Sequence, residues 1–256
     1  MGYLELKGIT VDFNGFRAVN DVTLSIEKGE LRVLIGPNGA GKTTIMDMIT
    51  GKTRPTAGTI WIAGQPITGL SPYKIASKYK IGRKFQGPNI FANMTVFENV
   101  EVALAGHNRL WQTFAYRRTE KTRKAILEIL EKINLVEQAD IISASLSHGQ
   151  RQWLEIGMVL AQNPEIILLD EPTSGMTAEE TYKTGEMITS IMKDKTVLVI
   201  EHDIDFVKQI AQKVTVLHHG EILAEGSYEE ITANPEVVKV YLKTDEFDEQ
   251  GALHGN

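Results

Sequence analysis

Residues 36–43 read Gly-Pro-Asn-Gly-Ala-Gly-Lys-Thr and match the pattern G-x-x-x-x-G-K-[ST] at every fixed position. Residues 31–35, Leu-Arg-Val-Leu-Ile, precede them and predict a buried strand, and residues 44–49 predict a helix. Such a loop wraps its backbone N–H groups around nucleotide phosphates, with the Lys42 ammonium on the outer phosphates and the Thr43 hydroxyl on Mg²⁺. The nucleotide contacts that we expect from this segment come from Asn38, Gly39, Ala40, Gly41, Lys42, Thr43 and Thr44.

Two carboxylates end a second apolar run. Residues 166–169 are Ile-Ile-Leu-Leu, and Asp170 and Glu171 follow them. This order is typical of a central parallel strand whose C-terminal end faces the nucleotide. There Asp170 would hold Mg²⁺ through a water molecule, and Glu171 would polarise the attacking water as a general base. The alternative is a buried strand that ends in two solvated acids, and the phosphate loop favours the site.

Residues 146–150, Leu-Ser-His-Gly-Gln, precede a helical pattern. Ser147 and Gln150 have the spacing of a capping box, so we expect Ser147 to begin the helix. A helix start that carries Ser147 and Gly149 is a second anion site. Because the phosphate loop already holds one nucleotide, this tip is expected to close on the nucleotide of another subunit.

On these residues the chain resembles the ATP-binding-cassette transporter ATPases, whose signature is L-S-G-G-Q. The resemblance runs from about residue 3 to about residue 243 with the family's motifs in order, although His148 replaces a signature glycine. It implies that Ser147, Gly149 and Gln150 contact the partner's nucleotide. It also implies an α/β fold with a P-loop core of mainly parallel strands, an antiparallel β-subdomain and an inserted helical subdomain.

The resemblance implies three further site residues. Gln86 would sense Mg²⁺ and the transport partner, His202 would contact the γ-phosphate, and Phe13 would stack on adenine. The competing interpretations are a plain loop amide, a surface histidine at a strand end and a core aromatic. Thr177 stands where the family has an aspartate that crosses the dimer interface, so a hydroxyl replaces a charge there.

Composition excludes several classes of function. The chain has 256 residues, and its 27 Lys+Arg against 33 Asp+Glu give a net charge of −6, which argues against a nucleic-acid partner. It has no cysteine, so neither disulfides nor thiol catalysis contribute. The N-terminal residues lack the blocks of a secretory signal, and no apolar run approaches the roughly 20 residues of a membrane helix.

The order of the patterns predicts one cassette domain over residues 1–256. Residues 3–9, 21–26 and 59–62 alternate as antiparallel strands do, and strand–helix alternation starts at the phosphate loop and resumes after Pro164. The subdivision that we expect is a core with its β-subdomain at 1–88 and 163–243, a helical subdomain at 89–162, and a mobile acidic tail at 244–256. Within the helical part, residues 119–134 carry an apolar stripe of Ile126, Ile129, Leu130 and Ile133.

The resemblance implies an ATP-hydrolysing importer subunit that lies peripherally on the cytoplasmic face of the cell membrane. Its partners would be a second ATPase subunit (a copy or a paralogue), membrane permease subunits that dock at residues 87–99, and indirectly an external solute-binding protein. Residues 15–22 and 234–242 resemble the branched-chain amino acid and amide uptake group, and residues 147–158 with 175–177 most resemble urea-uptake ATPases. The resemblance therefore implies that the importer takes up urea or a small amide. The alternatives are import of branched-chain amino acids, lipopolysaccharide export and iron–sulfur assembly.

Overall fold

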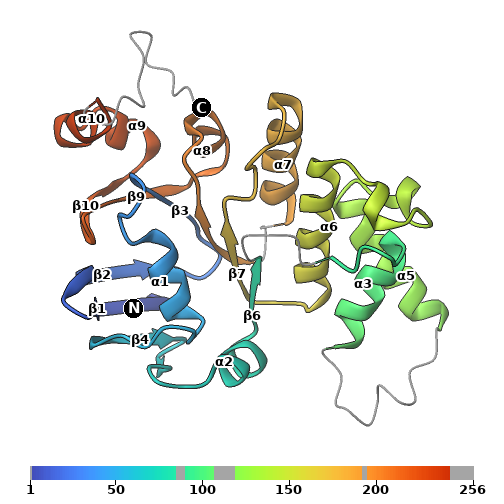
Figure 1. Cartoon of the computed structure of the whole chain (residues 1–256), viewed down its shortest axis with the longest axis horizontal. Coiled ribbons are helices and arrows are strands. Elements are labelled where there is room, and N and C mark those ends of the chain that lie inside the picture. The colour runs from blue at the N-terminus through green and yellow to red at the C-terminus, as the bar shows by residue number, and fades with distance from the viewer. Residues whose placement is uncertain (1, 85–89, 107–118, 192–194, 243–256) are drawn as a thin grey trace.

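The computed structural model describes residues 2–84, 90–106, 119–191 and 195–242. Within these residues the strands form two sheets, a core sheet of order β10-β9-β3-β8-β7-β6 and an antiparallel sheet of order β2-β1-β4-β5 (Figure 1). The core strands are β3 (Leu31–Ile35), β6 (Ile81–Lys84), β7 (Ile166–Asp170), β8 (Thr196–Ile200), β9 (Lys213–His218) and β10 (Glu221–Gly226). All neighbours in this sheet are parallel except β9 and β10. The expected α/β fold class is confirmed.

The antiparallel sheet begins with a long hairpin. Its strands are β1 (Leu4–Phe13), β2 (Phe16–Ile26), β4 (Ala57–Ile62) and β5 (Gln65–Pro66). The predicted strands at 3–9 and 21–26 are therefore parts of longer ones. The turn between them is Asn14-Gly15, whose φ angles of 53° and 93° are both positive, as a tight two-residue hairpin turn requires.

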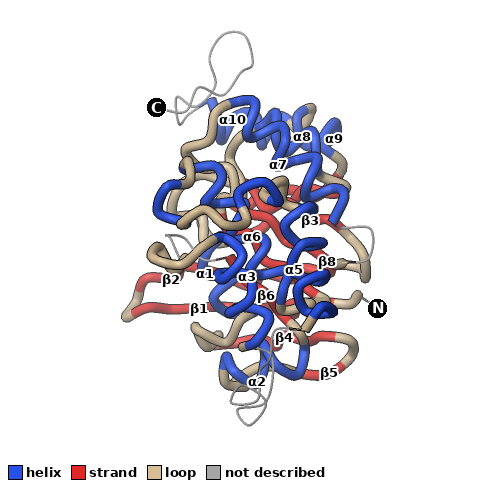
Figure 2. Tube along the Cα trace, turned by 90° about the vertical axis from the view of Figure 1, so that its right-hand side faces the viewer, coloured by secondary structure: helices blue, strands red, loops and turns tan. Residues whose placement is uncertain are grey.

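The helices of the described residues have the following bounds. They are α1 (Lys42–Ile49), α2 (Pro72–Tyr79), α3 (Val96–Ala105), α5 (Glu120–Lys132), α6 (His148–Ala161), α7 (Ala178–Ile191), α8 (Ile204–Ile210), α9 (Tyr228–Thr232) and α10 (Pro235–Leu242). Helices α3, α5 and α6 gather on one side of the molecule, in front of the core sheet in Figure 2. In α5, Ile126 and Leu130 are fully buried, as its predicted apolar stripe requires.

The core sheet lies between two apolar clusters. The five residues of each of β3, β7 and β8 are all buried, which explains why these strands are apolar except at Arg32, Asp170 and Thr196. Alternate residues face opposite sides: Val33 and Ile35 pack with the helices, whereas Leu34 packs with the antiparallel sheet and α1.

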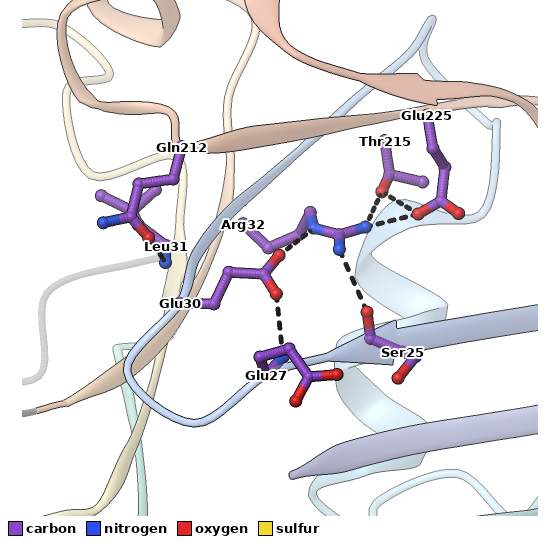
Figure 3. A network of polar contacts seen from close by, with 8 residues as sticks. All are labelled: Ser25, Glu27, Glu30, Leu31, Arg32, Gln212, Thr215 and Glu225. Carbon is purple, nitrogen blue, oxygen red and sulfur yellow. Dashed lines mark hydrogen bonds and ion pairs between the residues drawn. The ribbon is translucent and has the colours of Figure 1, made fainter. Parts of the chain in front are cut away.

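One charged residue is buried between these layers. The Arg32 side chain is 1% exposed, and its guanidinium donates to Glu30 Oε1 at 2.6 Å, to Thr215 Oγ1 at 2.8 Å, to the Ser25 backbone oxygen at 3.0 Å and to Glu225 (Figure 3). These partners come from β2, β9, β10 and the residue before β3. The network therefore ties the antiparallel sheet to the strand that carries the phosphate loop.

Candidate nucleotide site

The sheet register brings three strand ends to one edge. Leu34 of β3 and Asp170 of β7 both pair with Ile200 of β8. The residues that follow each strand therefore leave the sheet at the same level, and these are the phosphate loop, Glu171 and His202. In a mainly parallel sheet, this C-terminal edge is where ligands bind.

The phosphate loop needs glycine at two of its turns. Gly36 and Gly41 have φ angles of 149° and 99°, in the region that glycine occupies most readily. A Cβ on Gly36 would collide with the backbone oxygen of Leu217, and one on Gly41 would lie 2.6 Å from that of Ala18. The loop is thus pressed against neighbouring backbone on its outer side, which fixes its shape.

Lys42, the first residue of α1, lies within the loop. Its side chain is buried, and Nζ donates to the backbone oxygens of Gly36 at 2.5 Å and of Pro37 at 3.1 Å. No side chain caps the start of α1 at Gly41, and its first turn has no acidic residue. The loop therefore combines an ammonium group with an uncapped helix N-terminus, which together favour a phosphate. Thr43 is exposed and Thr44 is half-buried beside it.

Of the two carboxylate oxygens of Asp170, one is paired with Arg83 and the other has no hydrogen-bond partner among the described residues. Its side chain is 1% exposed, and Arg83 donates to Oδ2 at 3.2 Å while also pairing with Asp47 at 2.5 Å. Oδ1 has no hydrogen-bond partner among the described residues. Burial raises the pKa of Asp170 despite the opposing charge of Arg83. A buried oxygen of this kind suits a hard divalent cation such as Mg²⁺.

A cation at Asp170 would need ligands besides protein carboxylates. Across the described parts of the chain, no group of three or more His, Cys, Asp or Glu side chains could hold a metal ion. Magnesium commonly takes one or two protein ligands together with phosphate oxygens and waters. The donor set therefore fits Mg²⁺ that arrives with a nucleotide.

Glu171 and His202 face each other across the ends of β7 and β8. Glu171 has a φ of 47°, and its N–H donates to the Ile200 backbone oxygen at 3.0 Å. His202 Nδ1 lies 3.9 Å from Glu171 Oε1, and the two side chains are 59% and 25% exposed. Both groups can thus reach a bound molecule from solvent, as a general base and a phosphate contact require.

Glu201 was not singled out from the sequence, although it joins the loops that follow β7 and β8. It is fully buried and accepts from Thr173 Oγ1 at 2.6 Å, from Thr173 N at 3.0 Å and from His202 N at 3.1 Å. Burial raises its pKa, whereas the Thr173 hydrogen bonds lower it. Its signal in the sequence is a carboxylate directly after the apolar run of residues 197–200.

The predicted capping box at the start of α6 is confirmed. Ser147 Oγ accepts from Gln150 N at 3.2 Å, and Gln150 Oε1 accepts from Ser147 N at 3.0 Å. Among the described residues, the Ser147 side chain also reaches Glu180 on α7, and none of its hydrogen bonds leads to the phosphate loop. This tip therefore stands apart from the loop of its own chain.

Phe13 and Gln86 are the two remaining predicted site residues. Phe13 is 49% exposed at the end of the β1–β2 hairpin, where it pairs with Phe16, so it is not a core aromatic. Gln86 lies outside the described residues, as does part of the segment 87–99 that was expected to dock a permease. No helix in the described ranges has the length and apolar character needed to cross a membrane.

The fold and this edge define a nucleotide-binding cassette, and comparison with known proteins assigns it. Residues 19–174 match the family described as ABC transporter, and residues 221–242 match that described as branched-chain amino acid ATP-binding cassette transporter. The chain belongs to the ABC transporter family, as an ATPase whose hydrolysis is coupled to transport.

Its relatives cover nearly the whole chain. The branched-chain amino acid transport ATP-binding protein BraF of Pseudomonas aeruginosa is 39% identical over 93% of this chain and 97% of its own length. LivG of Escherichia coli is 37% identical over the same shares. Among solved structures, the ADP conformation of the cassette MJ1267 matches with a TM-score of 0.83 and 31% identity, over 94% of this chain and 99% of that one. A dimeric post-hydrolysis state of the cassette MJ0796, bound to ADP and Pi, matches with a TM-score of 0.76 and 29% identity, over 88% and 98%.

Proposed function

We propose that the edge formed by β3, β7 and β8 binds Mg-ATP and hydrolyses it with Glu171 as the general base. The observation that carries this is the meeting of the Lys42 loop, the unpaired Asp170 oxygen and the Glu171–His202 pair on one edge. The loop from Asn38 to Thr44 would hold the phosphates, with Lys42 on the outer ones. Phe13 would stack on the adenine.

Asp170, Thr43 and Gln86 would hold the Mg²⁺ that accompanies ATP. When bound, that ion neutralises charge on the phosphate oxygens. Glu171 would take the proton of the attacking water, which its quarter-exposed side chain can reach, and His202 would contact the γ-phosphate. Glu201 would keep the backbone of His202 in place through its hydrogen bond to the His202 N–H.

A complete site would require a second subunit, a copy of this chain or a paralogue. Ser147, Gly149 and Gln150 stand at the start of α6, away from their own phosphate loop, and would close on the partner's nucleotide. The solved dimer of a similar cassette supports this arrangement. Closing on ATP and reopening after hydrolysis gives two states that permease subunits can couple to transport. The chain would lie peripherally on the cytoplasmic face of the membrane.

For the solute there are two candidates. Import of branched-chain amino acids is supported by the names of the relatives. Import of urea or a small amide, fed by an external solute-binding protein, is supported by residues 147–158 and 175–177, which resemble urea-uptake ATPases. No residue of an ATPase subunit need touch the solute, so the transporter itself has to be assayed.

The test is uptake in cells that lack this gene and receive either the wild-type chain or Lys42→Ala. Labelled leucine and labelled urea are supplied at low external concentration. Loss of leucine uptake supports the first candidate, loss of urea uptake the second, and Lys42→Ala should restore neither. Unchanged uptake of both solutes in the deleted strain would contradict both assignments. Purified wild-type chain that hydrolyses no ATP would contradict the proposed catalytic site.

A further inference from the structure

The starts of α6 and α7 share one carboxylate. Thr177 and Glu180 form a capping box at the start of α7: Glu180 Oε2 accepts from Thr177 N at 3.0 Å and Oγ1 at 3.1 Å, and Thr177 Oγ1 accepts from Glu180 N at 3.3 Å. The other oxygen, Oε1, accepts from Ser147 Oγ at 3.4 Å. The two capping boxes are therefore joined through Glu180.

Glu180 also lies against the backbone of Gly149. A Cβ on Gly149 would collide with Glu180 Oε1, so the carboxylate packs directly on the backbone of the α6 tip. A negative charge at a helix N-terminus is favourable, and it stabilises this packing. The contact holds the start of α6 against the start of α7.

His148 makes a second link between the same two segments. Its Nε2 lies 2.9 Å from the Ser174 backbone oxygen. A carbonyl only accepts, so Nε2 carries the hydrogen. Ser174 lies three residues after Glu171, in the loop that joins β7 to α7. The ring thus ties the α6 tip to the loop that begins with the general base.

Other hydrogen bonds restrain the remainder of the loop that joins β7 to α7. Glu171 N bonds to the Ile200 oxygen, and Thr173 bonds to the buried Glu201. Further along the helices, Trp153 of α6 donates to Thr184 of α7 at 2.8 Å in the interior, so α6 and α7 are packed side by side (Figure 1). Because these contacts restrain the loop, we expect a displacement of the α6 tip to displace the loop as well.

We propose that His148 and Glu180 are positioning residues that form a clasp between the signature tip, residues 147–150, and the loop 171–177 of the same chain. This inference rests on the proposed dimer, in which the tip acts on one ATP and Glu171 on the other. The clasp then links the two ATP sites through a single chain. It offers a role for the two residues that depart from the family pattern: His148 makes the link, and Thr177 anchors Glu180 without adding a charge.

The experiment compares ATP hydrolysis by purified wild type, His148→Ala and His148→Gln over a range of ATP concentrations. In His148→Ala the Hill coefficient should fall toward one, and kcat should fall by about 3- to 10-fold, the equivalent of one hydrogen bond. Affinity of the single chain for a fluorescent ATP analogue should not change, because the phosphate loop is untouched. His148→Gln, which restores an N–H at similar reach, should recover most of both losses.

Glu179→Gln is the matched control, because Glu179 is 77% exposed on the same turn of α7 and pairs only with Lys183 among the contacts described. It should behave as the wild type. Cooperativity that is absent from the wild type, or a Hill coefficient that His148→Ala leaves unchanged, would overturn the clasp. Either result can occur with normal ATP hydrolysis, so the proposed function would stand. Absence of ATP hydrolysis by the purified wild-type chain would contradict both the clasp and the proposed function.

Discussion

Replacing Thr173 by valine tests how Glu201 holds the catalytic edge together. Valine keeps the shape of threonine and removes the hydroxyl that donates to Glu201 Oε1 at 2.6 Å. Thr173 is 6% exposed and Glu201 is fully buried, so water does not replace the lost donor. The bond from Thr173 N to the same oxygen remains in the variant.

The cost of this change depends on the charge of Glu201. A hydrogen bond contributes about 0.5–1.5 kcal/mol with a neutral partner and about 1.5–3 kcal/mol with a charged one. Burial raises the pKa of Glu201 above its ordinary 4.5, and the Thr173 hydroxyl lowers it. Removing the hydroxyl therefore raises the pKa of Glu201 further. Above pH 4.5 the folded variant holds more protons than the folded wild type, so its stability falls more steeply as pH rises through the raised pKa.

We expect Thr173→Val to lower the free energy of unfolding, measured by urea unfolding, by more at pH 8 than at pH 5. The cost should rise from about 1 kcal/mol toward about 2–3 kcal/mol as Glu201 ionises. Thr196→Val is the control: Thr196 is 1% exposed, and its hydroxyl accepts from the Gly29 backbone N–H at 3.0 Å, a neutral partner. Its cost should be about 1 kcal/mol at both pH values. A Thr173→Val cost that is flat, or larger at pH 5, would refute the reasoning.

Three further changes test other parts of the molecule. Glu171→Gln should keep ATP binding, lower hydrolysis by about 10² or more and trap an ATP-bound dimer on gel filtration; wild-type turnover would remove Glu171 from the base role. Arg32→Met should cost about 3 kcal/mol in urea unfolding, because Glu30 and Glu225, whose side chains are 13% and 30% exposed, would lose their cation; a loss below about 1 kcal/mol would contradict this. Thr177→Ala should cost about 1 kcal/mol through the lost cap of α7, an effect that an unchanged thermal midpoint would exclude.

The parts of the site that the sequence predicted are those built from neighbours along the chain. The phosphate loop follows its strand and precedes its helix directly, so its glycines and Lys42 are placed by local geometry. The capping box of Ser147 and Gln150 spans three residues and is equally local. The strand of Asp170 and Glu171 could be predicted because a fully buried parallel strand is an unbroken apolar run.

Contacts between distant residues could not be predicted in the same way. Arg83 reaches Asp170 across 87 positions, Thr173 reaches Glu201 across 28, and Ser147 reaches the side chain of Glu180 across 33. Each depends on which strands and helices become neighbours, which local patterns do not fix. The hairpin strands extend beyond the predicted ranges for a different reason: Asn14-Gly15 forms the tight turn that joins them, and alternation of apolar residues does not mark that turn.

The edge of the core sheet buries charged groups. Burying a charge contributes little to the stability of a protein that binds no ligand there. Lys42 is enclosed by backbone oxygens of its own loop, and Asp170 has a buried oxygen with no partner among the described residues. Glu171 adds a positive φ that a non-glycine residue adopts only at some cost. A nucleotide with Mg²⁺ would add a phosphate beside the Lys42 ammonium and a cation beside the Asp170 carboxylate. We therefore expect Mg-ATP to stabilise the fold by an amount that grows with the logarithm of its concentration above the dissociation constant.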